Sequence, residues 1–214
     1  MKLLIFDLDG TLLNTLEDLA DSANHILQQH HLPTHPIDAY RYFVGNGIPK
    51  LIERIMPEGK KQSTEYQQCL QEFLAYYQIH LADKTHPYEG MTETLEILQS
   101  RGIKLAVATN KVHSAVAPLM QDFFPTIHFD VMIGQREGVP VKPAPQIVFD
   151  IMAAAGCEAK DTLYAGDTSV DVQTGHNAGL PVIGLLWGYR PRKELEDSGA
   201  DYLISSPREL LNFC

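Results

Sequence analysis

The sequence predicts an α/β protein that combines a doubly wound parallel sheet with an inserted all-helical segment, and three observations support this. Leu3 to Phe6 form a short apolar run that ends at Asp7, which is typical of a strand buried on both faces. From Thr15 to about Asp83 the apolar residues recur at helical spacing. Beyond residue 87, strand-length and helix-length segments alternate, which implies right-handed crossovers between parallel strands.

The helical segment is predicted to be a cap domain over residues 14–86, inserted in a core formed by residues 1–13 and 87–214. Its first helix begins near Thr15 and places two acidic residues in the first turn, where the helix dipole favours them. Residues 31–36 end that helix. The remaining helical stretches run from near Pro36 to Phe43, from Ile48 to Met56 and, after a loop, from Gln62 to Leu81.

The core is predicted to continue with strands and helices in alternation, bounded by glycine or proline. After Leu3 to Phe6, the strands are Ile103 to Ala108, Val131 to Ile133, Thr162 to Ala165, Val182 to Leu186 and Tyr202 to Ile204. The helices are Thr92 to Ser100, Ser114 to Phe123, Pro145 to Ala155, Val170 to Ala178, Lys193 to Asp197 and a last helix from Pro207. Ligands of such sheets bind beyond the carboxyl ends of the strands, so polar residues there are candidates for a site.

Composition restricts the possible functions. The chain has 214 residues and a formal net charge of -10, so a sequence-independent grip on nucleic acid or on an anionic membrane is not expected. Its three cysteines show neither a disulfide framework nor a paired metal spacing, which favours a reducing cytoplasm. We expect no signal peptide, and no apolar run approaches the ~20 residues of a membrane span. Monomer and homodimer both stay open.

Asp7 and Asp9 follow the first strand and are predicted to leave its tip on one face, with Cα atoms roughly 6–7 Å apart. Two carboxylates at this distance repel each other. Unless one of them takes up a proton, a hard cation such as Mg²⁺ most easily keeps the pair ionised. Gly10 permits a sharp turn or the close approach of a bound group, and Thr11 offers a hydroxyl. The alternative is a simple turn at Asp9 and Gly10.

Three further groups of polar residues follow predicted strand ends. Thr109 and Asn110 lie where a helix is expected to begin, so they either cap that helix or bind phosphate oxygens. Lys142 is either a solvated loop lysine or a fixed positive charge for a phosphoryl group. If Asp167 starts a helix, Asp171 faces the same side. Capping would explain one of these acids, and a metal site or an ion pair with Lys142 would explain the second.

These motifs resemble, in order, the four motifs of the haloacid dehalogenase-like superfamily. The motifs are Asp7-Leu8-Asp9-Gly10-Thr11, the strand end at Thr109, Lys142-Pro143, and Gly166-Asp167 with Asp171. Within that superfamily the chain is similar from end to end to phosphoglycolate phosphatases. This similarity rests on Val44 to Leu51, Leu186 to Pro191 and Gly199 to Tyr202. Asn14-Thr15 stands where many relatives have Asp-Ser, a difference near the hinge rather than in the chemistry.

The resemblance implies a Rossmann-like core and a phosphoric monoester hydrolase for a small phosphorylated metabolite, with 2-phosphoglycolate as the expected substrate. Asp7 would form an aspartyl-phosphate, and Asp9 would protonate the leaving alkoxide and then deprotonate the attacking water. Mg²⁺ would be held by the Asp7 carboxylate, the Asp9 carbonyl and Asp167, with Asp171 either a direct ligand or behind the ligands. The residues expected to hold the phosphoryl oxygens are Gly10, Thr109, Asn110 and Lys142.

In the predicted cap domain, a glycine-rich turn precedes a helix. We expect Gly45, Asn46 and Gly47, with the helix N-terminus and Arg41 or Lys50 nearby, to bind a carboxylate of the substrate. A glycine-rich turn with solvated charges explains the same residues equally well.

Three other functions stay open. A dehalogenase of the same fold needs neither the second acid nor a metal, so Asp9 and Asp167 argue against it. A sugar phosphate mutase similar to β-phosphoglucomutase, or a phosphatase for another small phosphometabolite, shares every core residue. A phospho-acceptor signalling domain also has an Asp, a Thr and a Lys at strand ends. A signalling domain of this kind is a single domain with the acceptor Asp on a middle strand, whereas Asp7 follows the first strand here.

Overall fold

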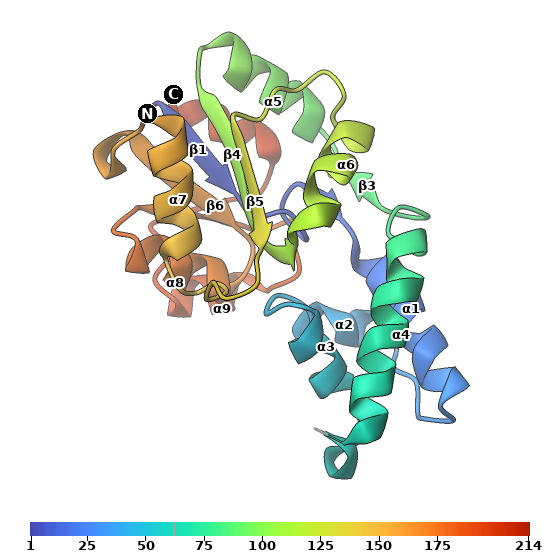
Figure 1. Ribbon diagram of the computed structural model, residues 1–214. Helices are drawn as coiled ribbons and strands as arrows, with labels where there is room; N and C mark the ends of the chain where they lie inside the picture. Colours follow the sequence, from blue (N-terminus) through green and yellow to red (C-terminus); the bar gives the residue numbers. More distant parts are fainter. Residues whose placement is uncertain (62) are drawn as a thin grey trace. The chain divides into compact units, whose positions relative to one another are not determined.

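The computed structural model describes residues 1–61 and 63–214. The chain divides into two compact units, a core unit of Met1–Asn14 and Pro87–Cys214 and a helical unit of Thr15–His86. Figure 1 shows the helices and strands of both units, coloured along the sequence.

The core unit is built on a six-stranded sheet with the order β5-β4-β1-β6-β7-β8, in which every neighbouring pair is parallel. The predicted doubly wound parallel sheet is therefore confirmed. The chain starts in the middle, adds two strands on one side of β1, and then adds three on the other, so the strand order reverses at β1. The strands are β1 (Leu3–Phe6), β4 (Lys104–Val112), β5 (Val131–Gln135), β6 (Thr162–Gly166), β7 (Val182–Leu185) and β8 (Tyr202–Ile204).

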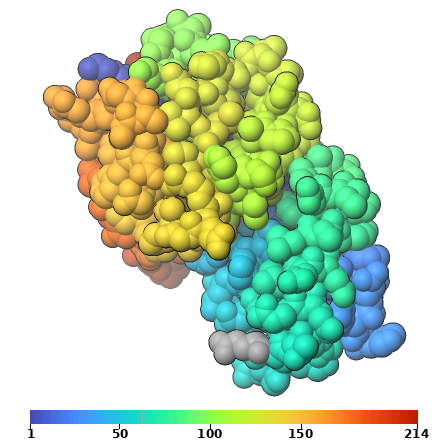
Figure 2. All heavy atoms as spheres, in the orientation of Figure 1, coloured from blue at the N-terminus to red at the C-terminus, as the bar shows by residue number. Residues whose placement is uncertain are grey.

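Helices cover both faces of this sheet because successive side chains of a strand point to opposite faces. Leu4 and Phe6 of β1 belong to one apolar cluster, and Leu3 and Ile5 to the other. The first cluster includes residues of α5 (Met91–Ser100), α6 (His113–Phe123) and the 3-10 helix η3 (Pro207–Phe213). The second includes residues of α7 (Gln146–Ala155), α8 (Ser169–Asn177) and α9 (Arg192–Asp197). In Figure 2, yellow-green to orange segments that include α6 and α7 form much of the visible surface of the core unit.

Two predicted elements of the core differ from the structure by more than two residues at an end or in the type of helix. Strand β4 does not end at Ala108 but runs on to Val112, with an irregular register opposite β5 between these two residues. Thr109 and Asn110 therefore lie within a strand, and helix α6 begins only at His113. The interpretation that they cap a helix is wrong. The last predicted helix is a 3-10 helix.

The helical unit contains four α-helices and a short 3-10 helix among its described residues. Their bounds are α1 (Leu16–Gln29), α2 (Ile37–Phe43), α3 (Ile48–Ile55), η1 (Glu58–Lys60) and α4 (Thr64–His80). Helix α4 begins with an N-cap, because the Ser63 side chain accepts a hydrogen bond from the Tyr66 N–H at 3.2 Å. The predicted start of this helix at Gln62 lies outside the described residues.

The two ends of the helical unit are fastened to each other by a buried carboxylate. Asp18 of α1 is 3% exposed and accepts hydrogen bonds from the backbone N–H groups of Lys84 and Thr85 and from the Thr85 hydroxyl. Strand β2 (Leu13–Asn14) pairs with β3 (His86–Pro87) in a separate two-stranded sheet. The chain therefore enters and leaves the helical unit at neighbouring points. None of the described helices combines the length and apolar character needed to cross a membrane.

Candidate active site

Four segments of the core unit bring their polar side chains to the carboxyl edge of the sheet. Phe6, the last residue of β1, pairs with Val107 of β4 on one side and with Ala165 of β6 on the other. Asp7 therefore emerges between the segments that carry Thr109 and Asp167. This is the position beside the reversal of strand order where α/β sheets bind their ligands.

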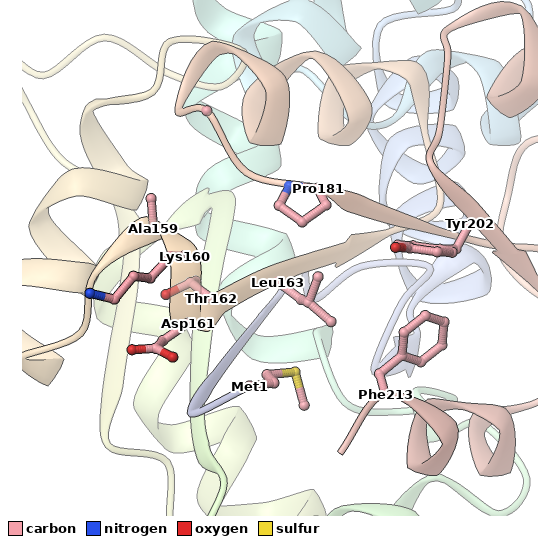
Figure 3. A pocket seen from close by; sticks show the side chains of 10 residues that line it. Met1, Ala159, Lys160, Asp161, Thr162, Leu163, Pro181, Tyr202 and Phe213 are labelled. Carbon is pink, nitrogen blue, oxygen red and sulfur yellow. The ribbon is translucent and has the colours of Figure 1, made fainter.

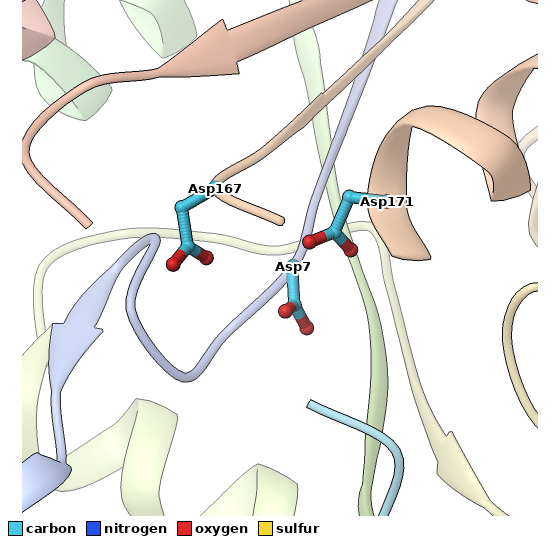
Figure 4. Close-up of side chains that lie close together, drawn as sticks. All are labelled: Asp7, Asp167 and Asp171. Atoms are coloured by element: carbon cyan, nitrogen blue, oxygen red, sulfur yellow. The ribbon is translucent and has the colours of Figure 1, made fainter. Parts of the chain in front are cut away.

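Three carboxylates converge at this edge, as Figure 4 shows. One carboxylate oxygen each of Asp7, Asp167 and Asp171 lies within 4.8 Å of the other two. All three side chains belong to buried residues. Three carboxylates that are this close together and excluded from water repel one another strongly unless a cation shares the site.

Lys142 supplies one such cation. It is 1% exposed, and its Nζ lies 2.9 Å from Oδ1 of Asp7 and 2.7 Å from Oδ1 of Asp171. The ammonium group also donates to the Ala108 carbonyl at 2.9 Å and to the Tyr164 hydroxyl oxygen at 3.1 Å. The sequence left open a solvated loop lysine, and the structure shows a buried one in an ion pair with Asp171.

The electrostatics of the site follow from burial and from this excess of acids. Burial raises the pKa of Asp7 from its ordinary value of 3.8 to about 7, although the charge of Lys142 opposes the shift. Burial, followed by the charges of Asp171 and Asp7, also raises the pKa of Asp167 well above its usual range. For Lys142 burial alone lowers the pKa, but Asp171 and Asp7 outweigh it and hold the pKa well above its usual value.

Asp171 has a structural partner besides Lys142. Thr168, not Asp167, is the N-cap of α8, and Asp171 completes the capping box at the third helical position. Its Oδ2 accepts from the Thr168 N–H at 3.1 Å and from the Thr168 hydroxyl at 2.7 Å. The condition considered from sequence, a helix that starts at Asp167, is not met, and the acid that takes part in capping is Asp171.

The Asp167 side chain packs directly against the backbone of two glycines, Gly10 and Gly188. Its Oδ1 accepts from the Thr11 hydroxyl at 2.9 Å and its Oδ2 from the Tyr189 N–H at 2.7 Å. A Cβ atom on Gly10 or Gly188 would overlap the Asp167 side chain, and Gly10 also has a φ of +86°. The sequence predicted a sharp turn or a close approach to a bound group at Gly10, and the structure shows a close approach to the Asp167 side chain.

Asn110 connects the end of β4 to the Lys142 loop. Its Oδ1 accepts from the Lys142 N–H at 2.9 Å, and its Nδ2 donates to the Lys142 carbonyl at 3.2 Å. This two-way contact fixes the backbone from which the Lys142 side chain enters the site. Thr109 lies alongside, buried, and its hydroxyl oxygen accepts from the Lys111 N–H at 3.2 Å.

Lys111 is a charged residue of the site that the sequence interpretation did not select. Its Nζ lies 3.1 Å from Oδ1 of Asp9, and its side chain is 3% exposed. The sequence predicts that strand β4 ends at Ala108, so it places Lys111 in the segment between the strand and the helix from Ser114. A strand that continues past Ala108 would have placed it at the sheet edge beside Asp9.

A divalent cation fits this donor set. The Oδ1 atom of Asp7 is buried and accepts no hydrogen bond within the described part of the chain, although the Lys142 ammonium lies near it. Carboxylate oxygens are the ligands that Mg²⁺ prefers, and the cluster holds three carboxylates against one ammonium. Asp171 already accepts hydrogen bonds at both oxygens, so Asp7 and Asp167 are the better candidates for direct ligands.

The predicted carboxylate-binding residues lie in the helical unit. Gly47 precedes α3, and it has a φ of +83°. The Asn46 side-chain oxygen accepts from Arg54 at 2.7 Å, and Lys50 forms an ion pair with Glu53 at 2.8 Å. The structure thus gives two of these residues partners within their own unit.

The core unit also has a hollow of about 400 Å³, shown in Figure 3. It lies at the amino ends of the strands, where Thr162 begins β6, Pro181 precedes β7 and Tyr202 begins β8. This is the edge opposite to the acids. None of the predicted site residues lines it.

Comparison with known proteins gives concordant matches. A family model described as haloacid dehalogenase-like hydrolase matches residues 4–185. A phosphoglycolate phosphatase of Haemophilus influenzae is 36% identical, covering 99% of this chain and 97% of its own length. One from Mannheimia succiniciproducens is 34% identical, covering 98% of this chain and 96% of its own. The crystal structure of a predicted phosphoglycolate phosphatase from Haemophilus somnus 129PT has a TM-score of 0.91 and 32% identity, covering 100% of this chain and 97% of that one.

Proposed function

This chain belongs to the haloacid dehalogenase-like hydrolase family, and on that premise we propose that it is a phosphomonoesterase that hydrolyses 2-phosphoglycolate to glycolate and phosphate. The observation that carries the proposal is the buried contact of Lys142 with Asp7 and Asp171, beside Asp167, at the carboxyl edge of the sheet. The phosphoglycolate phosphatases among its relatives support the substrate.

Asp7 is the nucleophile in this proposal. Its carboxylate sits at the end of the central strand, with Oδ1 buried beside the Lys142 ammonium. One oxygen of this carboxylate attacks phosphorus, the bond to the leaving oxygen breaks, and an aspartyl-phosphate forms. Water then attacks the phosphorus, and phosphate leaves with Asp7 restored. Splitting the reaction in this way replaces one difficult displacement by two easier ones.

Asp9 is the general acid and base. It lies two residues after Asp7 and is partly exposed, so it can reach both the leaving group and water. In the first step it gives a proton to the departing alkoxide, and in the second it takes a proton from the attacking water. The proton that it lends in the first step is thereby recovered in the second.

Mg²⁺ is the proposed metal, held by the carboxylates of Asp7 and Asp167 and by the Asp9 carbonyl, with Asp171 next to them. When bound, it offsets the charge of the acids and of the phosphoryl group. Lys142 adds a fixed positive charge that the protein has already paired and desolvated, so little reorganisation is needed when the phosphoryl group moves.

Thr109, Asn110 and Gly10 are the proposed contacts for the phosphoryl oxygens. Thr109 contributes a hydroxyl. The Gly10 N–H donates to the Leu13 carbonyl at 2.8 Å, so the contribution of Gly10 is a turn without a side chain beside Asp167. The side chain of Asn110 holds the Lys142 backbone on both sides, so its contribution includes placing Lys142. Loss of Asn110 should therefore affect phosphoryl binding and the position of the ammonium together.

The helical unit is proposed to select the leaving group through Gly45, Asn46, Gly47 and Lys50. The test compares turnover of 2-phosphoglycolate with that of p-nitrophenyl phosphate in Lys50→Ala. If the ratio of the two rates equals that of the unaltered protein, Lys50 has no part in recognition. The same comparison with Arg41→Ala tests the other basic side chain near this turn.

A screen of phosphomonoesters in the presence of Mg²⁺ tests the proposed function, with phosphate release as the readout. We expect many turnovers of 2-phosphoglycolate by the unaltered protein and none by Asp7→Asn, which serves as the blank. Chelation of the metal should abolish turnover. A hexose phosphate in the panel separates a mutase, which would give an isomer instead of phosphate. A single turnover with retained phosphate would identify a phospho-acceptor domain and refute the proposal.

A further inference from the structure

Lys111 is a buried cation that the mechanism above does not use. It lies near the end of β4 and is 5% exposed as a residue. Among the described residues, the lysine and arginine residues that are buried are Lys111, Lys142 and Arg190. Burial of an ammonium group costs free energy, so a buried lysine is expected to have an ionic partner or a functional role.

Asp9 is a partner of Lys111, and it is the residue that handles the proton of the leaving group in the proposed mechanism. The Lys111 Nζ lies 3.1 Å from Oδ1 of Asp9, whose side chain is 15% exposed. Lys142 has its own acids, Asp7 and Asp171, at the phosphoryl side. The two lysines therefore place positive charge at two different points, one beside the nucleophile and one beside the general acid.

The position beside the general acid matters because of the shape of the substrate. Asp9 must contact the oxygen that leaves phosphorus, and in 2-phosphoglycolate that oxygen is separated from the carboxylate by a single methylene group. A cation in contact with the Asp9 carboxylate is therefore within reach of the carboxylate of the leaving group. An ammonium group buried at this point binds an anion more strongly than one in water.

We propose that Lys111 is the residue of the core unit that binds the carboxylate of the leaving group, so that the site selects phosphate esters of small 2-hydroxy acids. This inference rests on the proposed function and names the group that reads the substrate. It needs no covalent step, since Lys111 stays an ammonium ion throughout. The arriving carboxylate contacts the Lys111 ammonium group, which in the free enzyme contacts Asp9. Asp9 is then freer to turn toward the leaving oxygen.

A purely structural role for Lys111 leads to a different result. If the ion pair only keeps Asp9 in place, its loss weakens proton transfer to every alkoxide leaving group. If Lys111 binds the substrate carboxylate, its loss penalises substrates that carry a carboxylate far more than those that lack one. The distinguishing quantity is a ratio of kcat/KM values for two substrates, which a general loss of activity leaves unchanged.

The experiment compares 2-phosphoglycolate with ethyl phosphate, in which a methyl group replaces the carboxylate and the leaving group is still an alkoxide. Lys111→Met removes the charge and keeps a long stem. Lys111→Arg restores a charge, and Lys193→Met removes an exposed lysine of α9 as the matched control. Circular dichroism checks the fold, and Lys111→Gln, which can still donate to Asp9, replaces Lys111→Met if that variant does not fold.

We expect the ratio of kcat/KM for 2-phosphoglycolate to that for ethyl phosphate to fall about 30-fold or more in Lys111→Met, as for loss of one partner of a desolvated charge pair. Lys111→Arg should recover part of the ratio, and Lys193→Met should keep it. Equal losses for both substrates would overturn the inference and leave the phosphatase proposal intact. A wild-type protein that releases phosphate from neither ester would instead refute the proposed function.

Discussion

The ammonium group of Lys142 lies 2.7 Å from Oδ1 of Asp171, and each side chain is only 1% exposed. The same nitrogen lies 2.9 Å from Oδ1 of Asp7. The two acids nevertheless differ in their surroundings. Asp171 accepts hydrogen bonds at both oxygens, whereas Oδ1 of Asp7 accepts none from the described residues. The same substitution at the two positions should therefore change the free energy of unfolding in opposite directions.

Asp7→Asn should stabilise the metal-free protein at about pH 8, because it removes a buried charge. The folded-state pKa of about 7 lies above the ordinary 3.8, so between these values the folded state binds more protons than the unfolded state. The free energy of unfolding therefore falls as pH rises through this window, by about 2–4 kcal/mol for Asp7. Urea unfolding in a chelator should show a smaller fall for Asp7→Asn. Parallel pH profiles for the two proteins would contradict this account.

Asp171→Asn should destabilise the metal-free protein, because it removes the anionic partner of the buried Lys142. The asparagine oxygen can still accept the Thr168 N–H, so the helix cap is largely kept. Breaking one side of a buried ion pair costs about 3–5 kcal/mol, and the nearby Asp7 reduces this to roughly 2–3 kcal/mol. The measurement is urea unfolding under the conditions used for Asp7→Asn. Equal stability of Asp171→Asn and the unaltered protein would show that the ion pair contributes nothing.

Gly188→Ala should weaken Mg²⁺ binding, because the added Cβ overlaps the side chain of Asp167. The carboxylate must move, at a packing cost of about 1–3 kcal/mol. In the unaltered protein, Mg²⁺ at about 100 times its dissociation constant should add about 2.7 kcal/mol of stability, measured as a rise in Tm. Gly59→Ala is the matched control, since nothing lies within 4 Å of its added Cβ. A full Mg²⁺-dependent rise in Gly188→Ala would contradict the proposed role of Asp167.

Asp18→Ala should destabilise the helical unit, because it removes the acceptor of the Lys84 and Thr85 backbone N–H groups, whereas the Thr85 hydroxyl can still donate to the Leu81 carbonyl. Donors left unsatisfied inside a protein cost about 1–3 kcal/mol each, so the total loss should be about 2–4 kcal/mol. Asp21→Ala, which removes an exposed acid that pairs with Lys84, is the control and should cost less than about 1 kcal/mol. Unfolding followed by circular dichroism checks both values. Equal effects of the two changes would refute the role of Asp18.

The strands of the core could be predicted from sequence because each is a short apolar run bounded by a turn residue or a charge. Asp7 and Asp167 could be found for the same reason, since a strand buried on both faces ends where a charge begins. The extension of β4 could not be predicted. Asn110 and Lys111 are polar, and they are buried only because Lys142 and Asp9, distant in sequence, supply their partners.

The contacts that hold the Asp167 side chain could not be predicted from sequence either. Its contacts include the N–H of Tyr189 and the bare Cα of Gly188, which lie more than a helix and a strand further along the chain. The pattern of apolar residues cannot predict such a contact, because every residue except proline has a backbone N–H donor. The capping box of α8 is present in the sequence as Thr168 followed three residues later by Asp171, but only Asp167 is considered from sequence as the start of the helix.

The most direct test of the account asks whether phosphate becomes attached to Asp7. Asp9→Asn lacks the base for the second step, while p-nitrophenolate leaves without help from an acid. Acid-quenched Asp9→Asn after reaction with p-nitrophenyl phosphate and Mg²⁺ should therefore carry one phosphoryl group on the peptide that contains Asp7, detected by mass spectrometry. The doubly substituted protein, with Asp7→Asn as well, should carry none. Release of p-nitrophenolate with Asp7 unmodified throughout the reaction would contradict the central claim.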